Sequence, residues 1–472
     1  MIFILKKYKI GNYTLDKYQT KIIKSNRKII QVIAGAGSGK TLTLTAKIKY
    51  LIQRGMNPNE ILCITFTKAA ALSLQNKLEK ENIKIKVHTF HSLSYNLIKN
   101  HYPNNLVNIN VLNEIIEKHL EKININDYTY QTKNNSKNNL KETINRFITL
   151  FKSNNYKKEK FKEFSKINKE TNDYYKYSKH NNFLKLTKKI YLDYQKYLIK
   201  NNNIDFSDMI NLGINVINKY GIYPYKYIII DEYQDISKNK CELIKEIIKK
   251  TNAKLLVVGD DWQSIYSFTG SNLEVFTNFK KYFPHTKRYY LKNTYRNSKQ
   301  LLNITSKFIK QNPNQLSKKL LSIKENNKPI KIYYYKDNIN KPLTHIIEKL
   351  KDKETLILGR NNKDEIKNLP KNVKFLTIHK SKGLEADNVI IINLTDENNS
   401  LPSKQIVNEF LKYVVQIKDD YPFSEERRLF YVALTRTKND VYLLVPENNP
   451  SIFVEELINK HKNKIEINSK FL

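Results

Sequence analysis

Two short stretches of the chain contain the residue types needed to bind and hydrolyse a nucleoside triphosphate. Residues 34–41 read Ala-Gly-Ala-Gly-Ser-Gly-Lys-Thr, and residues 228–235 read Ile-Ile-Ile-Asp-Glu-Tyr-Gln-Asp. A glycine-rich loop lets several backbone N–H groups approach phosphate oxygens closely. A strand that ends in adjacent carboxylates supplies a ligand for a divalent cation and a general base. Together, the two stretches predict triphosphate hydrolysis.

The glycine-rich stretch predicts a phosphate-binding loop between a strand and a helix. Lys40 is expected to neutralise the β- and γ-phosphates, and the Thr41 hydroxyl is expected to bind Mg²⁺. The usual pattern opens with glycine, whereas this chain has alanine there. A chance match is the alternative, but an apolar strand pattern before the loop and a helical pattern after it argue against chance. The residues expected to surround the phosphates are Ala34, Gly35, Ala36, Gly37, Ser38 and Gly39.

The second stretch supplies the acidic groups of the predicted site. Asp231 is expected to hold Mg²⁺, and Glu232 is expected to act as general base on the attacking water. An isolated Asp-Glu pair after a strand is equally typical of a solvated turn. Gln234 and Asp235 follow directly, and a phosphate loop lies upstream, so the catalytic interpretation is favoured.

The elements that would position these residues follow an α/β pattern. Short runs rich in β-branched residues alternate with amphipathic stretches, which is typical of a parallel sheet covered by helices. The strands expected in a first unit are Lys28–Ala34, Glu60–Phe66, Ile85–Phe90, Tyr225–Asp231 and Lys254–Asp260. Those expected in a second unit are Arg288–Asn293, Pro329–Tyr335, Glu354–Arg360, Val373–His379, Asn388–Leu394 and Asp440–Pro446.

Residues 95–204 interrupt the first unit with a different kind of sequence. The strand signals fade there, and a helical, Asn-, Lys- and Tyr-rich pattern with a basic excess takes over. We therefore expect residues 1–94 and 205–287 to form one α/β domain, residues 95–204 a basic helical insertion, and residues 288–472 a second α/β domain. The tail after Pro446 reads as short and polar.

The composition indicates a polyanionic partner. The formal net charge is +38, which is typical of a nucleic-acid-binding protein, although Lys- and Asn-rich codon bias accounts for part of the excess. The two cysteines, Cys63 and Cys241, lack neighbours at metal-ligand spacing, so an intracellular, reducing compartment is expected. No uncharged apolar run approaches about 18 residues, so no membrane span is expected. The sequence does not distinguish a cytoplasmic from a nuclear location, and it leaves a viral origin open.

Residues 259–270 carry a resemblance to a known family. They read Gly-Asp-Asp-Trp-Gln-Ser-Ile-Tyr-Ser-Phe-Thr-Gly, which closely resembles the third motif of superfamily 1 helicases of the UvrD/Rep type. The trio Asp-Trp-Gln is most similar to the helicase IV branch. Further motifs resemble this family in its own order, from Leu15 to about Leu444: Leu15–Gln19, Thr65–Ala70, His88–Ser92, Ile204–Asp208, Asn293–Asn297, Thr377–Glu385 and Glu426–Arg436.

The resemblance implies a fold and a set of nucleotide contacts. The implied fold is two RecA-like P-loop NTPase domains in tandem, 1A and 2A, with the helical insertion 1B inside 1A. The implied nucleotide is ATP with Mg²⁺. The resemblance assigns adenine recognition to Gln19, stacking on the base to Tyr295 and a nucleotide contact to Glu385. Contacts with the γ-phosphate are assigned to Gln263, Arg296 and Arg436.

A second set of residues is implied to contact DNA. Aromatic side chains on loops can stack on bases at about 1–3 kcal/mol per base with little sequence preference. Core packing is the alternative for Phe66 and Tyr266, whereas Phe268 has polar neighbours and is expected to be exposed. The family more often has Trp at the last position. The residues implied to contact DNA are Phe66, His91, Tyr266, Phe268, His379 and Lys382.

One family feature is missing from the sequence. In UvrD and Rep, a helical subdomain called 2B interrupts 2A just before the motif found here at Thr377–Glu385. In this chain only ten residues, 363–372, separate the neighbouring strand patterns. The 2B subdomain is therefore expected to be absent or reduced to a turn. In relatives it restrains unwinding by the monomer, so its absence predicts either an unrestrained enzyme or one that needs a partner.

The resemblance implies an ATP-dependent DNA helicase that translocates on single-stranded DNA, with 3′→5′ movement. Expected partners are single-stranded DNA and junctions between single- and double-stranded DNA, and a monomer is expected in isolation. Two alternatives stay open: a translocase that remodels protein–DNA complexes without unwinding, and an RNA-directed helicase. The intact set of residues expected at the nucleotide site argues against a third, a binding factor without ATPase chemistry. The pathway, whether replication, repair or recombination, is not written in the sequence.

Overall fold

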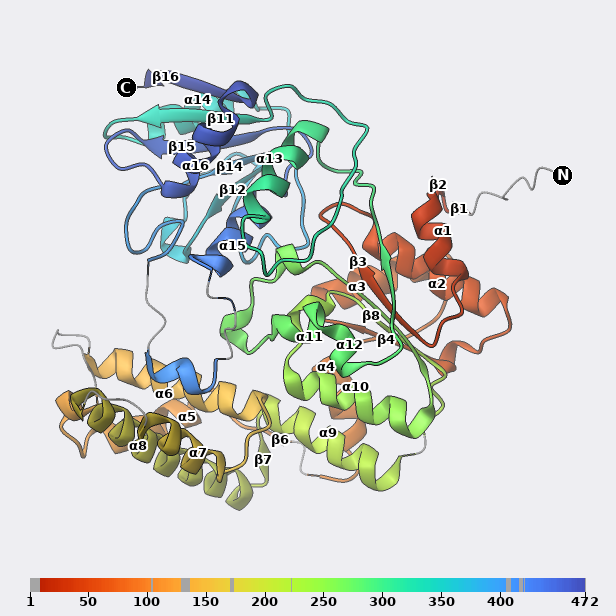
Figure 1. Cartoon of the computed structure of the whole chain (residues 1–472), viewed down its shortest axis with the longest axis vertical. Helices are drawn as coiled ribbons and strands as arrows, with labels where there is room; N and C mark the ends of the chain where they lie inside the picture. Colours follow the sequence, from red (N-terminus) through yellow and green to blue (C-terminus); the bar gives the residue numbers. More distant parts are fainter. Residues whose placement is uncertain are drawn as a thin grey trace.

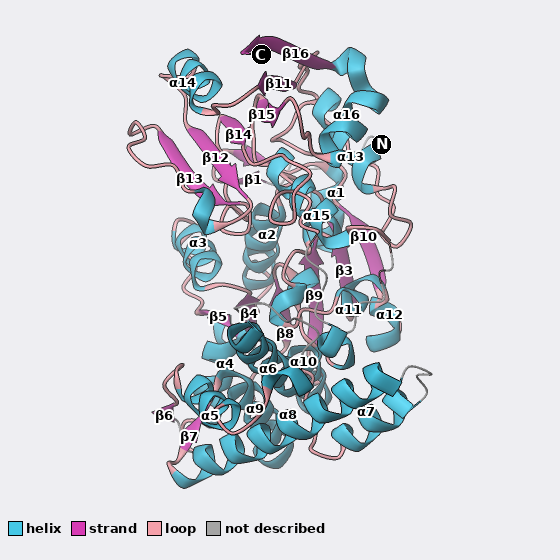
Figure 2. Cartoon of the chain, turned by 90° about the vertical axis from the view of Figure 1, so that its left-hand side faces the viewer, coloured by secondary structure: helices cyan, strands magenta, loops and turns pink. Residues whose placement is uncertain are grey.

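The computed structural model describes residues 9–102, 105–128, 136–169, 174–221, 223–404, 409–415, 419 and 421–471. Two six-stranded, all-parallel sheets organise the chain, one in each α/β domain. Figure 1 shows them at different heights of the molecule, with a helical unit at the lower left. Figure 2, turned by 90°, shows the same three parts. The tandem α/β fold expected from the sequence is therefore confirmed.

The first sheet has the strand order β10-β3-β9-β8-β4-β5. Its strands are nearly continuous apolar runs because both faces are covered by helices, as in other parallel sheets. The core on one face contains residues of α4, α9, α10, α11 and α12, and the core on the other face contains residues of α1, α2 and α3. The strands are β3 (Ile29–Ile33), β4 (Ile61–Thr65), β5 (Val87–Thr89), β8 (Tyr227–Ile230), β9 (Lys254–Gly259) and β10 (Lys287–Tyr290).

The helices of 1A begin at the carboxyl ends of these strands or connect them. A short hairpin of β1 (Lys9–Ile10) and β2 (Tyr13–Thr14) precedes the first helix. The helices are α1 (Lys17–Lys24), α2 (Lys40–Gln53), α3 (Lys68–Glu79), α4 (Phe90–Ile98), α9 (Phe206–Tyr220), α10 (Lys238–Thr251), α11 (Leu273–Thr277) and α12 (Phe279–Tyr282).

Strand β10 corrects the expected boundary between the two α/β domains. We expected Arg288–Asn293 to open the second domain, but Lys287–Tyr290 pairs in parallel with Ile30–Ile33 at the edge of the first sheet. The strand pattern was recognised correctly, but periodicity carries no information on which sheet a strand joins. Domain 1A therefore continues beyond the expected boundary at residue 288, through Tyr290.

The second sheet has the order β13-β12-β14-β15-β11-β16. One face packs against α13, α15 and α16, and the other packs against α14. The strands are β11 (Ile330–Tyr335), β12 (Thr355–Gly359), β13 (Val373–Thr377), β14 (Asn388–Ile391), β15 (Val441–Pro446) and β16 (Ile465–Phe471). The helices are α13 (Lys299–Ile309), α14 (Asn340–Lys349), α15 (Ser424–Leu434) and α16 (Ile452–His461).

The segment after Pro446 is not the short polar tail that the sequence suggested. It forms α16 and then β16, which pairs in parallel with β11 and completes the sheet edge. Phe453, Val454 and Leu457 of α16 are buried in the 2A core. The few apolar residues of this segment suffice to build a helix and a strand, because they pack against β11 and the neighbouring helices of 2A.

In its described residues, the insertion 1B is a bundle of four helices joined to 1A by a narrow neck. The helices are α5 (Val111–Leu120), α6 (Ser136–Ser153), α7 (Lys160–Lys169) and α8 (Tyr174–Lys200). At the neck, β6 (Asn105–Leu106) pairs with β7 (Asn203–Ile204). The expected start at residue 95 falls inside α4, whose Leu97 and Ile98 are buried in the 1A core. The insertion therefore begins after α4, later than predicted.

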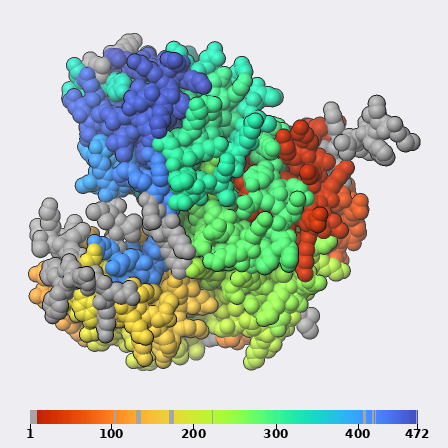
Figure 3. Space-filling model, viewed as in Figure 1, coloured from red at the N-terminus to blue at the C-terminus, as the bar shows by residue number. Residues whose placement is uncertain are grey.

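A segment of 2A forms part of the 1B core. Residues Glu409–Val415, which we call the strap, lie between β14 and α15 in the sequence. Four of its side chains are buried in the 1B core cluster: Phe410, Leu411, Tyr413 and Val414. In Figure 1 the strap is the blue turn beside α6, and Figure 3 shows its blue atoms among the yellow atoms of 1B. The sequence did not predict this contact.

Specific contacts hold the strap on 1B. The Phe410 ring stacks on Phe183 with a centroid separation of 4.3 Å and an interplanar angle of 8°. The Tyr413 hydroxyl lies 2.9 Å from Nδ1 of His180, and Asn154 Nδ2 donates to the Val414 carbonyl at 2.9 Å. On both sides of the strap the chain contacts 2A again. Before it, the Ser403 amide donates to the Glu426 carboxylate, and after it, the Arg428 side chain donates to the Asp419 carboxylate.

The 2B subdomain is absent from its expected position. Between β12 and β13, where every residue is described, the chain forms only a short 3₁₀ turn at Asn362–Asp364 and a connecting loop. This agrees with the expectation from the ten intervening residues. Within the described part of the chain, no helix is both long and apolar enough to cross a membrane.

Phe410→Ala tests whether the strap stabilises 1B. Removing a buried Phe side chain typically costs about 3–5 kcal/mol. We expect amides of α6 and α8 to lose protection from hydrogen exchange, whereas amides of β3 and β11 keep theirs. The control is Ile199→Ala at a position of α8 that is 76% exposed. Unchanged protection in α6 and α8 of Phe410→Ala would contradict a structural role for the strap.

Candidate functional site

The phosphate loop lies between β3 and α2, at the carboxyl end of the first sheet. Gly37 and Gly39 have φ angles of +67° and +76°, the left-handed region that favours glycine. The Ser38 hydroxyl donates to the Gly35 carbonyl at 2.9 Å, and the Ala34 amide donates to the Gly259 carbonyl of β9 at 2.9 Å. The loop therefore has the backbone geometry of a phosphate cradle, and alanine at its first position does not disturb it.

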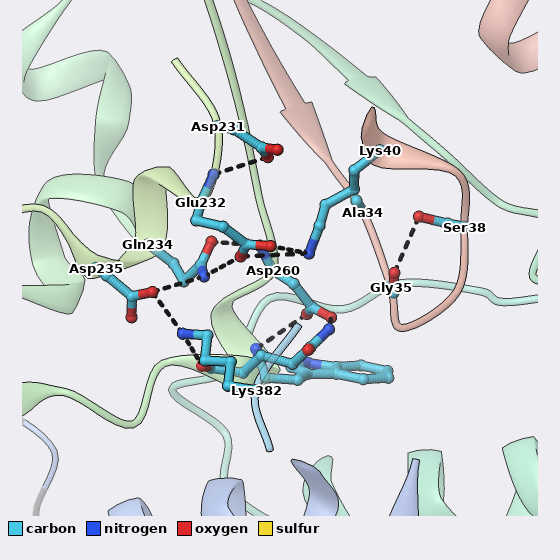
Figure 4. A network of polar contacts seen from close by, with 12 residues as sticks. Ala34, Gly35, Ser38, Lys40, Asp231, Glu232, Gln234, Asp235, Asp260 and Lys382 are labelled. Carbon is cyan, nitrogen blue, oxygen red and sulfur yellow. Dashed lines mark hydrogen bonds and ion pairs between the residues drawn. The ribbon is translucent and has the colours of Figure 1, made fainter. Parts of the chain in front are cut away.

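Lys40 and Glu232 form an ion pair beside this loop. The Lys40 ammonium lies 3.1 Å from Oε1 of Glu232, and the two side chains are 13% and 22% exposed. Figure 4 shows both pointing into the same space. Burial alone would lower the pKa of Lys40, but the carboxylates of Glu232, Asp260 and Asp231 outweigh it and raise the pKa. The lysine is therefore charged at neutral pH.

The two adjacent carboxylates have different environments. Burial raises the pKa of Asp231, and the charge of Glu232 raises it further. Burial acts in the same direction on Glu232, but Lys40 and Lys382 outweigh it and hold its pKa below the usual value. Glu232 also adopts a left-handed backbone conformation, φ 50° and ψ 40°, which costs about 1–2 kcal/mol in a residue with a Cβ. Backbone strain of this kind is typical of functional positions.

The donors near the loop suit Mg²⁺. The Asp231 carboxyl and the Thr41 hydroxyl, at the first turn of α2, are hard oxygen ligands of the type that Mg²⁺ prefers, together with phosphate oxygens and water. Asp231 is 7% exposed, and its Oδ1 accepts a backbone bond from the Glu232 amide at 2.8 Å. Among the described residues, no cluster of three or more His, Cys, Asp or Glu side chains offers an alternative, all-protein metal site.

A chain of polar contacts leads from Glu232 towards 2A. Gln234 Nε2 donates to Glu232 Oε2 at 2.6 Å and to Asp235 Oδ2 at 3.1 Å. Asp235 in turn forms an ion pair with Lys382 of 2A, and Lys382 Nζ donates to the Gln263 carbonyl at 2.7 Å. Figure 4 shows the contacts from Lys40 to Lys382. Burial raises the pKa of Asp235 to about 6 despite the Lys382 charge.

Gln263 meets Arg436 at the seam between the two sheets. Arg436 follows α15 of 2A, and its Nη2 donates to Gln263 Oε1 at 2.9 Å. The opposite end of the same amide, Nε2, donates to Asp260. Arg436 is 1% exposed, and burial together with the nearby Arg296 charge lowers its pKa to about 9. The guanidinium is therefore a buried cation held close to the phosphate-binding side of 1A.

Arg296 approaches the phosphate loop from the 2A side. The Tyr295 amide donates to the Gly37 carbonyl at 2.9 Å, so the backbone of this segment touches the loop. The Arg296 side chain donates through Nε to Glu385 Oε2 at 2.7 Å and through Nη1 to the Thr435 carbonyl at 3.1 Å. The structure thus brings Arg296 and Glu385 together, as expected for two residues assigned to one nucleotide.

Gln19 and Tyr295 lie at the open side of the loop. The capping box of α1 fixes the Gln19 amide, because its Oε1 accepts from the Asp16 amide at 2.9 Å. Its Nε2 is buried and has no partner among the described residues. A Cβ on Gly39 would lie 2.8 Å from this Nε2 and 3.9 Å from the Tyr295 ring. Tyr295 is 48% exposed and donates its hydroxyl to Asp16. The unpaired Nε2 donor of Gln19 could bind an acceptor on the edge of an adenine base, and the exposed ring of Tyr295 could stack on its face.

The aromatic residues implied to contact DNA form one cluster. Phe66 stacks on Tyr266 at 5.7 Å, and both are half-buried, so packing against each other uses part of their faces. Phe268 is 43% exposed, and its ring stands perpendicular to His379 at 5.3 Å. The expectation that Phe268 is the most exposed of these rings is confirmed. Tyr266 also donates its hydroxyl to the His379 carbonyl of 2A at 3.1 Å, which joins the two domains.

Two of the implied DNA contacts are less accessible than expected. The Lys382 side chain is 7% exposed and is bound by Asp235, so it lies in the polar chain of the nucleotide site. His91 is half-buried, and burial together with the Lys240 charge lowers its pKa to about 4. Direct DNA contacts by these two residues stay predictions.

Two lysines at the site were not predicted from the sequence. Lys318 is buried against Asp260 and Asp261, and Lys240 lies 4.6 Å above the Phe66 ring. Burial lowers the pKa of Lys240 to about 8. No motif singled out either residue, because a chain with 83 Lys and Arg residues offers no compositional contrast.

Comparison with protein families identifies two matching domains. A sequence model described as the UvrD/REP helicase N-terminal domain matches residues 15–284. A second one, the UvrD-like helicase C-terminal domain, matches residues 340–448. The two matches include the phosphate loop, the acidic strand end and Arg436.

Individual relatives show the same pattern. DNA helicase IV of Escherichia coli is 28% identical over 94% of this chain and 70% of its own length. The ATP-dependent DNA helicase PcrA of Staphylococcus aureus is 30% identical over 68% of this chain, and a probable DNA helicase II homolog of Mycoplasma capricolum is 31% identical over 74%. The chain spans only 43% and 48% of the latter two proteins.

Gln19→Ala tests the assignment of the base-recognition site. The variant loses one hydrogen-bond donor, worth about 0.5–1.5 kcal/mol, and we expect affinity for ATP to fall about 3- to 10-fold. Affinity for CTP is the internal control and should not change, because the free Nε2 donor can pair with N7 of a purine and cytosine has no such acceptor. Equal losses for both nucleotides, measured by titration with fluorescent analogues, would contradict base recognition by Gln19.

Proposed function

Because this chain belongs to the UvrD-like helicases, we propose that it couples ATP hydrolysis to 3′→5′ movement along single-stranded DNA and thereby unwinds duplexes. The expected contacts are single-stranded DNA and junctions between single- and double-stranded DNA. The direction of movement rests on family resemblance alone. The remaining steps of the proposal rest on contacts between described residues.

The contact between Arg436 and Gln263 is the observation that supports the proposal most directly. Arg436 belongs to 2A, whereas Gln263, Lys40 and Glu232 belong to 1A. A triphosphate bound at the phosphate loop would therefore lie between a lysine of one domain and guanidinium groups of the other. Arginines placed in this way contribute about 10³–10⁵ in rate to phosphoryl transfer. Hydrolysis would then depend on how closely the two domains approach.

The side chains of the site divide the chemical work. Glu232 is held ionised by Lys40, so it can orient a water molecule and accept its proton. Lys40 must exchange Glu232 for phosphate oxygens when a nucleotide enters, which leaves the carboxylate free to act. Thr41 and Asp231 would hold Mg²⁺, which supplies charge neutralisation for the phosphates. Arg296 and Arg436 would stabilise the charge that develops on the transferred group.

The polar chain links this chemistry to the aromatic cluster. Gln263 contacts Arg436 through its side chain and Lys382 through its carbonyl, and Lys382 Nζ lies 4.7 Å above the Tyr266 ring. Tyr266 in turn packs on Phe66 and bonds to the backbone of His379. A shift of 2A relative to 1A would therefore move the two sides of the aromatic cluster. Bases stacked there would change partners in each ATP cycle, which is the proposed step of translocation.

The principal experiment measures ATP turnover and unwinding in one preparation. We expect single-stranded DNA to stimulate turnover strongly, and duplexes with a 3′ tail to be unwound faster than duplexes with a 5′ tail. Lys40→Ala should abolish turnover while salt-sensitive binding to single-stranded DNA remains. Turnover that is indifferent to DNA and to RNA would refute the motor. Stimulation without strand separation would instead favour a translocase, and preference for RNA would favour an RNA-directed helicase.

The same assay tests the consequence of the missing 2B subdomain. With duplex in large excess over protein, each duplex carries at most one molecule. Unwinding under these conditions would support an unrestrained monomer. Unwinding only when several molecules load on one tail, or only with an added partner, would contradict it.

Phe268→Ala tests the proposed coupling. The exposed ring is a stacking platform worth about 1–3 kcal/mol per base, so its loss should slow unwinding about 10-fold or more while DNA-stimulated turnover falls much less. The control is Tyr13→Ala, which removes an aromatic ring that is 68% exposed on the amino-terminal hairpin. Parallel losses of turnover and unwinding in Phe268→Ala would indicate that the ring only packs.

A further inference from the structure

Lys318 is a buried cation at the centre of the seam, and no sequence motif includes it. It lies in the loop between α13 and β11, and its residue is 4% exposed. Its Nζ contacts Asp260, lies 2.7 Å from Oδ1 of Asp261 and donates to the Ala34 carbonyl at 3.0 Å. It also lies 4.5 Å above the Trp262 ring. One ammonium therefore touches the first residue of the phosphate loop and both carboxylates that follow β9.

Asp260 connects Lys318 to the Gln263 amide. The carboxylate is completely buried, and its two oxygens have different partners. Oδ1 accepts from Lys318 and from the Trp262 amide, whereas Oδ2 accepts from Gln263 Nε2. The Asp260 amide also donates to Gln234 Oε1 at 2.9 Å. The direction of the carboxylate is thus determined from both sides.

The orientation of Gln263 follows from this arrangement. An amide has one donor end and one acceptor end, and only the acceptor end can bind a guanidinium. Because Nε2 donates to Asp260, Oε1 faces Arg436 and accepts from its Nη2. A carboxylate that rotated away would leave Gln263 free to flip and to present a donor to Arg436. Lys318 opposes that rotation by holding Oδ1, to which the Trp262 amide also donates at 3.2 Å.

We propose that Lys318 is a positioning residue for ATP hydrolysis, which aligns Gln263 with Arg436 through Asp260 and fixes the start of the phosphate loop. The inference rests on the proposed function, because it assumes that Gln263 and Arg436 act on the same triphosphate. Lys318 itself touches no reacting atom. Its loop contacts 1A at further points, since the Leu316 amide donates to Asp261 Oδ2 at 2.7 Å and the Leu320 side chain packs on Gly35.

A purely structural role is the competing explanation, because an unpaired buried carboxylate destabilises any fold. The chain offers a matched control for it. Lys152 of α6 is also 4% exposed and also binds two carboxylates, Asp205 and Asp208, but it lies in 1B. Lys152→Met therefore removes the same kind of buried ion pair without touching the seam.

The experiment compares Lys318→Met, Lys318→Arg and Lys152→Met in the full chain. For Lys318→Met we expect kcat for ATP to fall about 100-fold, the size of effect seen when one oriented group of a catalytic site is lost, whereas KM changes less than about 3-fold. Lys318→Arg should restore most of kcat, because a cation again holds Asp260. Lys152→Met should lower thermal stability as Lys318→Met does but keep kcat per folded molecule.

A double substitution separates an effect through Gln263 from a general one. If Lys318 acts through Gln263, then Gln263→Ala combined with Lys318→Met should cost no more in kcat than the larger single loss. Multiplicative losses, an unchanged kcat in Lys318→Met, or an equal loss in Lys152→Met would each overturn the proposal. Turnover without DNA suffices for these comparisons. A lack of DNA stimulation in the unsubstituted chain would instead refute the proposed motor and leave the test of Lys318 intact.

Discussion

Compensation of buried charge at the seam between the two sheets is the constraint on which the rest of the structure depends. Lys40, Arg436, Lys318 and Lys382 lie there with the carboxylates of Glu232, Asp235, Asp260 and Asp261. Removing one member would leave its partner unpaired at low dielectric, which costs several kcal/mol. The cations come from both α/β domains, so the network holds only if 1A and 2A meet in this register. A triphosphate adds negative charge at the point where Lys40 and the arginines converge.

Much of the nucleotide site could be predicted from the sequence because its parts are local. The phosphate loop requires left-handed backbone at Gly37 and Gly39, and this requirement is visible as glycine in the sequence. Asp231 comes directly after the apolar strand β8, so its position at the carboxyl end of the sheet could be predicted from that strand. Ten of the eleven expected strands occupy the expected domains. Arg288–Asn293 is the exception, since hydrophobic periodicity predicts a strand but not the sheet that it joins.

The remaining features depend on contacts between distant segments. Lys318 is 58 residues from Asp260, and nothing in its local sequence distinguishes it from the other lysines. Lys382 was assigned to the strand-binding surface, but tertiary packing turns it towards Asp235. The strap looks like an ordinary loop of 2A, because its apolar residues meet their partners only in 1B. In each case the decisive neighbour belongs to another domain, which periodicity and motif spacing do not reveal.

The strap also changes which movements the protein can make. Domain 1A is joined to 1B at the neck and to 2A by the chain after β10, and the strap joins 2A to 1B. Because 1A, 1B and 2A are each connected to the other two, a rotation at one connection requires a compensating rotation at another. Opening of the seam must therefore either tilt the helical bundle at its neck or peel four apolar side chains out of it.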